Sequence, residues 1–100
     1  MIARVFFSET AQADLDSLFA WIADRAGYDR ALRYIGRIER YCLDLIPFPQ
    51  RGTARDDIRP GLRIIGFERR ITIAFTIRDE DAIILRILYA GRSIEQAFEG

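Results

Sequence analysis

The feature that most constrains the fold is a pair of strand-like runs between Leu62 and Arg92. Residues 71–78 and residues 83–89 are both rich in β-branched and aromatic side chains. In a strand, successive side chains of each run would alternate between two faces. This pattern is typical of strands that bury one face. The polar segment between the runs is short enough to require antiparallel neighbours. The sequence therefore predicts a β-hairpin, with a third strand leading into it from Leu62.

The N-terminal part predicts one strand and one helix. Residues 2–7 form a short apolar run suited to a strand at the far side or edge of the sheet. From residue 11 to residue 22, apolar side chains recur at helical spacing, which predicts an amphipathic helix of about four turns. Ser8 or Thr10 can cap its N-terminus.

A second helix is predicted to follow closely. Gly27 is suited to end the first helix and Asp29 to cap the next, whose apolar stripe runs through residues 31–45. The short linker predicts an antiparallel helical hairpin. The second helix also carries a row of arginines, which we interpret as a solvated helix face: Arg30, Arg33, Arg37 and Arg40.

The remaining segments complete a single domain of residues 1–100. Pro47 and Pro49 break the second helix, a polar loop continues to about Arg59, and Ser93 can cap a final helical turn. The element order is strand, helix, helix and three strands. We therefore predict an α+β domain in which the two-helix hairpin packs on one face of a three-stranded antiparallel sheet.

Composition limits the chemistry available. The 100 residues carry no net charge, and histidine, the most frequent acid–base catalyst near neutral pH, is absent. The single cysteine, Cys42, lies in an apolar helical pattern, so we expect a reduced, buried thiol and no metal or cofactor. No signal peptide is recognisable, and the longest apolar run, residues 18–23, is too short to span a membrane. A cytoplasmic location is expected.

The ordered set of elements resembles the RelE/ParE superfamily of bacterial toxins, and in particular its ParE branch. The resemblance covers almost the whole chain and rests on a first strand ending in Ser8, on Asp14-Leu15 and Trp21-Ile22 in the first helix, on Leu45-Ile46-Pro47-Phe48-Pro49 with Gly52 after the second helix, on Leu62-Arg63, and on the closing run from Ile84 to Arg92. Tyr89 departs from the ParE pattern, in which a histidine is common at this position.

This resemblance implies a toxin of a type II toxin–antitoxin pair that inhibits DNA gyrase, blocks replication and is neutralised by a ParD-like antitoxin of the ribbon-helix-helix class. Operator binding in such pairs belongs to the antitoxin. The absence of net charge agrees with no binding of duplex DNA by this chain alone. Two alternatives remain: a RelE-like ribosome-dependent mRNA endonuclease, and a toxin-fold protein that binds an antitoxin but has lost its activity.

The endonuclease alternative needs an acid–base pair and clustered cations. Only Tyr89 or a carboxylate such as Glu68 could act as the base, with Arg63 and Arg86 holding the phosphate, if these side chains share one sheet face. A tyrosine near its usual pKa of about 10 is a poor base. We therefore expect a protein without enzymatic activity.

The candidate residues for binding a target or partner come from the open sheet face, the C-terminal tail and the first helix. They are Arg63, Arg86, Tyr89, Arg92, Trp21, Ile84 and Leu88. Ile84 and Leu88 are expected to make that sheet face partly apolar, so that a partner would cover it. We expect Arg86→Ala and Arg92→Ala to reduce toxicity while leaving the fold intact.

Overall fold

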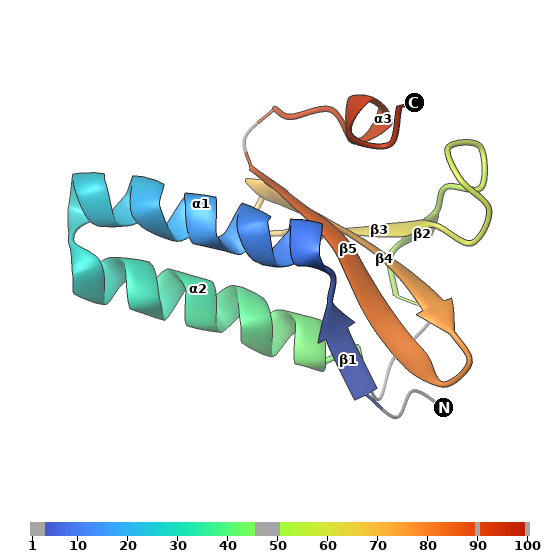
Figure 1. The fold of residues 1–100 in the computed structure, drawn as a ribbon, viewed down its shortest axis with the longest axis horizontal. Helices are drawn as coiled ribbons and strands as arrows, with labels where there is room; N and C mark the ends of the chain where they lie inside the picture. The colour runs from blue at the N-terminus through green and yellow to red at the C-terminus, as the bar shows by residue number, and fades with distance from the viewer. Residues whose placement is uncertain (1–3, 46–50, 90, 100) are drawn as a thin grey trace.

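The computed structural model describes residues 4–45, 51–89 and 91–99. It confirms the predicted α+β architecture, with a helical hairpin and an antiparallel β-hairpin (Figure 1). The predicted helix break at Pro47 and Pro49 lies outside the described residues. In chain order the elements are β1 (Arg4–Phe7), α1 (Glu9–Ala26), α2 (Tyr28–Leu43), β2 (Thr53–Ala54), β3 (Arg63–Phe67), β4 (Ile71–Arg78), β5 (Asp81–Tyr89) and α3 (Ile94–Ala97).

The sheet has five strands in the order β1-β5-β4-β3-β2, so the prediction of a three-stranded sheet was incomplete. β1 joins at one edge, parallel to β5, with Arg4 opposite Asp81. β2 joins at the other edge, antiparallel to β3. Its two residues are exposed and lie in a segment that the sequence predicts as a polar loop. Two residues are too few to show an alternation of apolar and polar side chains, so the sequence pattern could not predict β2.

The ends of the helices follow from local sequence. Ser8 caps α1, since its Oγ accepts a hydrogen bond from the backbone N–H of Ala11 at 3.0 Å. Gly27 has a φ of +96°, and it both ends α1 and precedes the first residue of α2. The predicted N-cap at Asp29 is wrong because this positive φ turns the chain within one residue, which places Asp29 inside the first turn of α2.

We predict that Ser8→Ala lowers the free energy of unfolding by about 1–2 kcal/mol. The change removes the helix cap and also the hydrogen bond that Ser8 Oγ donates to the carbonyl oxygen of Leu85 at 3.0 Å. Urea denaturation measures the effect. Thr10→Ala is the matched control, because Thr10 is exposed and lies inside the helix. Equal losses in both variants would contradict this role of Ser8.

A β-bulge interrupts the pairing of β4 with β5. Ala74 lies opposite Arg86, but the next residue, Phe75, lies opposite Ile84. Leu85 is therefore the extra residue on β5. A bulge of this kind reverses the alternation of side chains beyond it.

The bulge corrects the predicted faces of β5. Ile84 before it and Ile87 after it both belong to the core beneath the helical hairpin, whereas Leu88 lies on the other face. The prediction that Ile84 shares the open face with Leu88 is therefore wrong. The sequence pattern does not reveal the extra residue, so a regular alternation places Ile84 and Leu88 on the same face.

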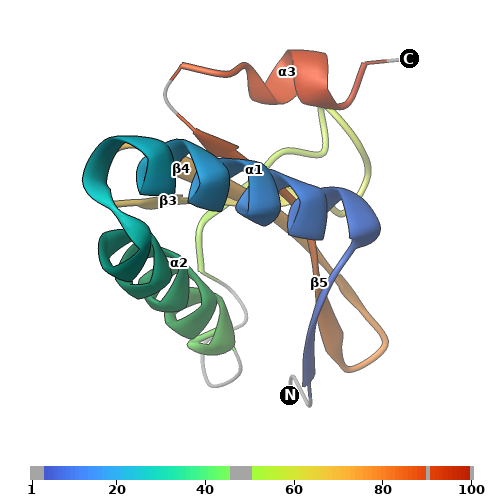
Figure 2. The same ribbon diagram turned by 60° about the vertical axis from the view of Figure 1, so that its left-hand side comes forward.

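Two apolar clusters lie on opposite faces of the sheet. The larger one lies under α1 and α2 and contains Leu15, Ile38, Ile73 and Phe75, among others. The smaller one is formed by Leu62, Ala74, Leu88 and Ile94, the last of which comes from α3. In Figures 1 and 2, α3 and α2 lie on opposite sides of α1. α3 thus covers part of the sheet face that the hairpin leaves open.

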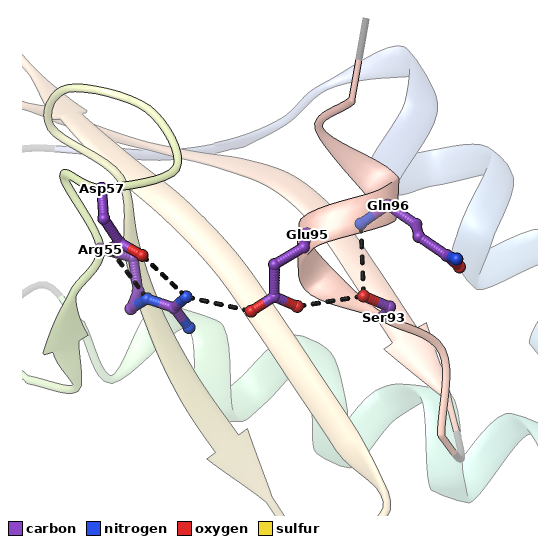
Figure 3. A network of polar contacts seen from close by, with 5 residues as sticks. All are labelled: Arg55, Asp57, Ser93, Glu95 and Gln96. Atoms are coloured by element: carbon purple, nitrogen blue, oxygen red, sulfur yellow. Dashed lines mark hydrogen bonds and ion pairs between the residues drawn. The ribbon is translucent and has the colours of Figure 1, made fainter.

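A polar network anchors α3 to the loop before β3 (Figure 3). Arg55 donates two hydrogen bonds to Asp57 and a third to Glu95, each 3.0 Å long. The hydrogen bond from Arg55 lowers the pKa of both Asp57 and Glu95. Ser93, the predicted cap of the last helical turn, accepts from the N–H of Gln96 at 3.3 Å and donates to Glu95. The prediction of a capped final turn is confirmed.

Candidate functional site

A concavity lies between the helical hairpin, the turn from β3 to β4 and the end of β5. We call it the arginine hollow. Its volume is about 640 Å³. It is lined by four arginines, two tyrosines, one carboxylate and two apolar side chains: Arg30, Arg33, Arg37, Arg70, Tyr34, Tyr89, Glu68, Ile22 and Ala26.

Helical spacing explains why three of the arginines meet. Arg30, Arg33 and Arg37 are three and four residues apart on α2, which places them on one helix face. Glu68 lies in the turn that links β3 to β4, where its φ of +48° bends the chain. β4 begins one residue after Arg70, so Glu68 and Arg70 both lie in the turn. Both side chains line the hollow together with residues of α2.

Several contacts organise the hollow. Arg37 forms an ion pair with Glu68 and lies over the ring of Tyr34, 5.2 Å from its centroid. Arg70 donates a hydrogen bond from Nη1 to the hydroxyl oxygen of Tyr89 at 3.4 Å, which raises the pKa of Arg70. Burial, followed by the charge of Glu68, raises the pKa of Tyr34. The Tyr34 hydroxyl therefore stays protonated near pH 7 and can act as a hydrogen-bond donor.

A second surface adjoins the hollow on the other side of Tyr89. We call it the Trp21 surface, and it consists of Trp21, Tyr89 and Arg92. The rings of Trp21 and Tyr89 lie 5.2 Å apart, and Arg25 lies over Trp21 at 4.2 Å. Trp21 is 43% exposed, which is unusual for so large an apolar side chain. Three of the predicted candidate residues are thus brought together.

Arg86, by contrast, is committed to the fold. Its Nε and Nη2 donate to the two carboxylate oxygens of Asp14 at 2.8 and 3.0 Å. Asp14 also accepts from the N–H of Ile87 at 2.9 Å, next to the bulge. The side chains of Asp14 and Arg86 are only 8% and 16% exposed. The expectation that Arg86→Ala leaves the fold intact is therefore not supported, because the change would leave a buried carboxylate without its cation.

The nuclease alternative needs Arg63 and Arg86 beside the base, and the structure places neither of them in the hollow that Tyr89 and Glu68 line. Arg63 pairs with Phe75 on β4, whereas Tyr89 pairs with Ile71, four residues away along that strand. This separation is about 13 Å at the rise of a β-strand. Arg63 directs its guanidinium group to the backbone carbonyls of Arg51 and Gly52. Arg63, Arg86 and Tyr89 therefore do not surround one phosphate-sized site.

The two aliphatic candidates are buried. Ile84 is 0% exposed and lies beneath the helical hairpin. Leu88 is 2% exposed and lies, as predicted, on the opposite face, but α3 and Leu62 cover it there. Neither side chain can contact a partner without displacing part of the fold.

Sequence reasoning missed the arginine hollow. It interpreted the arginine row of α2 as a solvated face, and three of its four members, Arg30, Arg33 and Arg37, line the hollow. The i, i+3, i+7 spacing of these three was the available signal. It could not show that the β3–β4 turn brings Arg70 to the same place.

Two further findings bear on the chemistry. Burial, and to a lesser degree the charge of Glu39, raises the pKa of the Cys42 thiol to about 12, so this thiol is a packing residue and not a nucleophile. None of the helices in the described ranges combines the length and the apolar character needed to cross a membrane.

The fold is that of a small α+β domain, and comparison with known proteins places it in a class. A family model described as ParE toxin of type II toxin-antitoxin system, parDE, matches residues 5–94. The chain therefore belongs to the ParE toxins of type II toxin–antitoxin systems.

Individual relatives agree. Toxin ParE3 of Caulobacter vibrioides is 33% identical over 87 residues, which cover 87% of this chain and 86% of the relative. Toxin ParE1 of Mycobacterium tuberculosis is 28% identical over 97 residues, with coverage of 96% and 98%. A solved structure described as the chromosomal ParDE TA system from P. aeruginosa superimposes with a TM-score of 0.76 at 25% identity, covering 90% of this chain and 97% of that one.

Proposed function

We propose that this ParE toxin acts without enzymatic activity by binding DNA gyrase in the cytoplasm, which blocks replication, and that a ParD-like antitoxin neutralises it. The observation that carries the proposal is the separation of the groups a nuclease would need. Arg86 is bound to Asp14. Arg63 and Tyr89 pair with residues at opposite ends of the first five residues of β4, Phe75 and Ile71. The two arginines assigned to the phosphate, Arg63 and Arg86, therefore do not converge with Tyr89, which favours recognition of a protein over cleavage of RNA.

The Trp21 surface is the contact we assign to the target. It combines an exposed tryptophan, a tyrosine and an arginine, the residue types that contribute most to protein interfaces. Arg92 lies in the segment after β5 and is exposed, so it can reach a partner without disturbing the sheet. The proposal thus retains Trp21, Tyr89 and Arg92 from the sequence analysis.

The antitoxin has a separate surface available. Tyr28 and Leu32, at the turn of the helical hairpin and on α2, are 63% and 48% exposed. Apolar side chains of this size, exposed on a small domain, are suited to burial by an amphipathic partner segment. The chain belongs to the ParE toxins of parDE systems, and this membership supports a ParD-like protein as that partner.

The proposal predicts that Trp21→Ala abolishes growth arrest while the antitoxin still binds. Truncation of an interface tryptophan typically costs at least about 2 kcal/mol, or about 30-fold in affinity. The measurements are growth after induction and gyrase-linked DNA breaks. Tyr28→Ala, which also removes an exposed aromatic ring from the hairpin, is the control and should retain growth arrest.

The alternatives give different outcomes in the same experiments. Cleavage of mRNA in translating ribosomes without gyrase-linked breaks would reject the proposal in favour of a RelE-like endonuclease. Binding of the antitoxin by a wild-type chain that causes no growth arrest would indicate a protein that has lost its activity.

A further inference from the structure

The arginine hollow has a surplus of positive charge that the fold does not balance. Of its four guanidinium groups, only that of Arg37 forms an ion pair with a described residue, Glu68. The side chains of Arg30 and Arg33 make no hydrogen bond or ion pair with any residue in the described ranges. Arg70 donates to the hydroxyl of Tyr89 and forms no ion pair with the residues that the structure describes. Three positive charges therefore face one concavity without a counter-charge from the described part of the chain.

Repulsion between these charges slightly lowers the stability of the fold while the hollow is empty. Like charges three and four residues apart on a helix repel one another, and Arg30, Arg33 and Arg37 have this spacing. An anion in the hollow would relieve the repulsion. Guanidinium forks match phosphate oxygens in pairs, so two or three of them can hold one polyphosphate chain.

The walls of the hollow are suited to more than a phosphate. The rings of Tyr34 and Tyr89, together with Ile22 and Ala26, form an apolar lining beside the charges. The volume of about 640 Å³ lies within the usual range of small-molecule sites. A nucleobase gains from stacking on an aromatic side chain, whatever its identity.

We propose that the arginine hollow binds a nucleoside di- or triphosphate, with its phosphates held by Arg30, Arg33 and Arg70 and its base against the tyrosine-lined wall. This site is distinct from the Trp21 surface, although Tyr89 borders both. The proposal does not depend on gyrase being the target. It adds a small-molecule ligand to a protein that is otherwise described by its protein partners.

Isothermal titration of the full-length chain with ATP and with GTP tests the proposal. The Arg30→Gln/Arg33→Gln double variant should bind at least about tenfold more weakly, because hydrogen bonds to charged groups contribute about 1.5–3 kcal/mol each. Arg40→Gln is the matched control, since Arg40 is exposed on the same helix but does not line the hollow. The Arg30→Lys/Arg33→Lys variant keeps the charge and should bind with intermediate affinity.

Three further titrations separate the contributions. Tripolyphosphate should bind more weakly than ATP because it lacks the base, and adenosine should bind very weakly because it lacks the charge. A glutamate-rich peptide should not compete with ATP. Equal affinity for tripolyphosphate and ATP, an equal loss in Arg40→Gln, or binding of the acidic peptide alone would each overturn the proposal. Thermal unfolding of every variant checks that the fold is retained.

Discussion

Replacement of Asp14 by alanine is expected to lower the free energy of unfolding by about 3–5 kcal/mol. Asp14 accepts three hydrogen bonds, two from Arg86 and one from the N–H of Ile87. Its removal leaves a largely buried guanidinium group and a backbone donor without their partner. For a domain of 100 residues this loss is a large fraction of the total stability.

The control for Asp14 lies on the same helix. Asp16→Ala removes an exposed carboxylate that accepts a hydrogen bond from Gln12, so the expected change is within about 0.5 kcal/mol. Urea denaturation of both variants measures the difference. A double-mutant cycle with Arg86→Ala should give a coupling energy of at least about 1 kcal/mol. A cycle without coupling would show that the two residues stabilise the fold independently.

This result matters for interpreting toxicity. A loss of growth arrest in Arg86→Ala would arise from unfolding and not from a lost contact with the target. Arg92→Ala is the informative variant of the two, because Arg92 is exposed and has no comparable ion pair to a buried carboxylate within the described residues. Toxicity assays on this protein should therefore be paired with a stability measurement.

Ile84→Ala is expected to cost about 2–5 kcal/mol, the usual range for truncation of a fully buried isoleucine. Ile84 is 0% exposed and packs in the cluster beneath the helical hairpin. The neighbouring Ile83 is only half-buried and points to the other side of the strand, so Ile83→Ala should cost about 1 kcal/mol. The comparison tests the orientation of β5 directly.

Thermal and urea unfolding should show the larger loss of stability in Ile84→Ala if Ile84 faces the helices, and in Ile83→Ala if Ile83 faces them. If Ile83→Ala were the more destabilising change, β5 would have to present its odd-numbered residues to the helices before the bulge. That outcome would contradict the pairing of Phe75 with Ile84. It would also restore Ile84 to the open face that the sequence pattern predicts.

The site was less predictable than the fold because its members come from separate elements. Trp21 and Tyr89 were each proposed from sequence, but their ring contact depends on how α1 lies across β5. Arg30 and Arg33 were assigned to a solvated face, since a helix pattern does not reveal what lies beside it. Arg86 was a candidate for binding a target, and its pairing with Asp14, 72 residues away, is not visible in the sequence.

The sequence by itself determined the features that depend on near neighbours. The cap at Ser8, the positive φ at Gly27 and the antiparallel pairing of β4 with β5 follow from short-range hydrogen bonding and steric limits. Only the tertiary structure decided which face of β5 is buried, because a single extra residue at Leu85 reverses the alternation. Beside that bulge, the carbonyl oxygen of Leu85 accepts from Ser8, the cap of α1, and the N–H of Ile87 donates to Asp14 within α1. The orientation of the strand is thus set by a helix distant in sequence, a dependence that no local pattern contains.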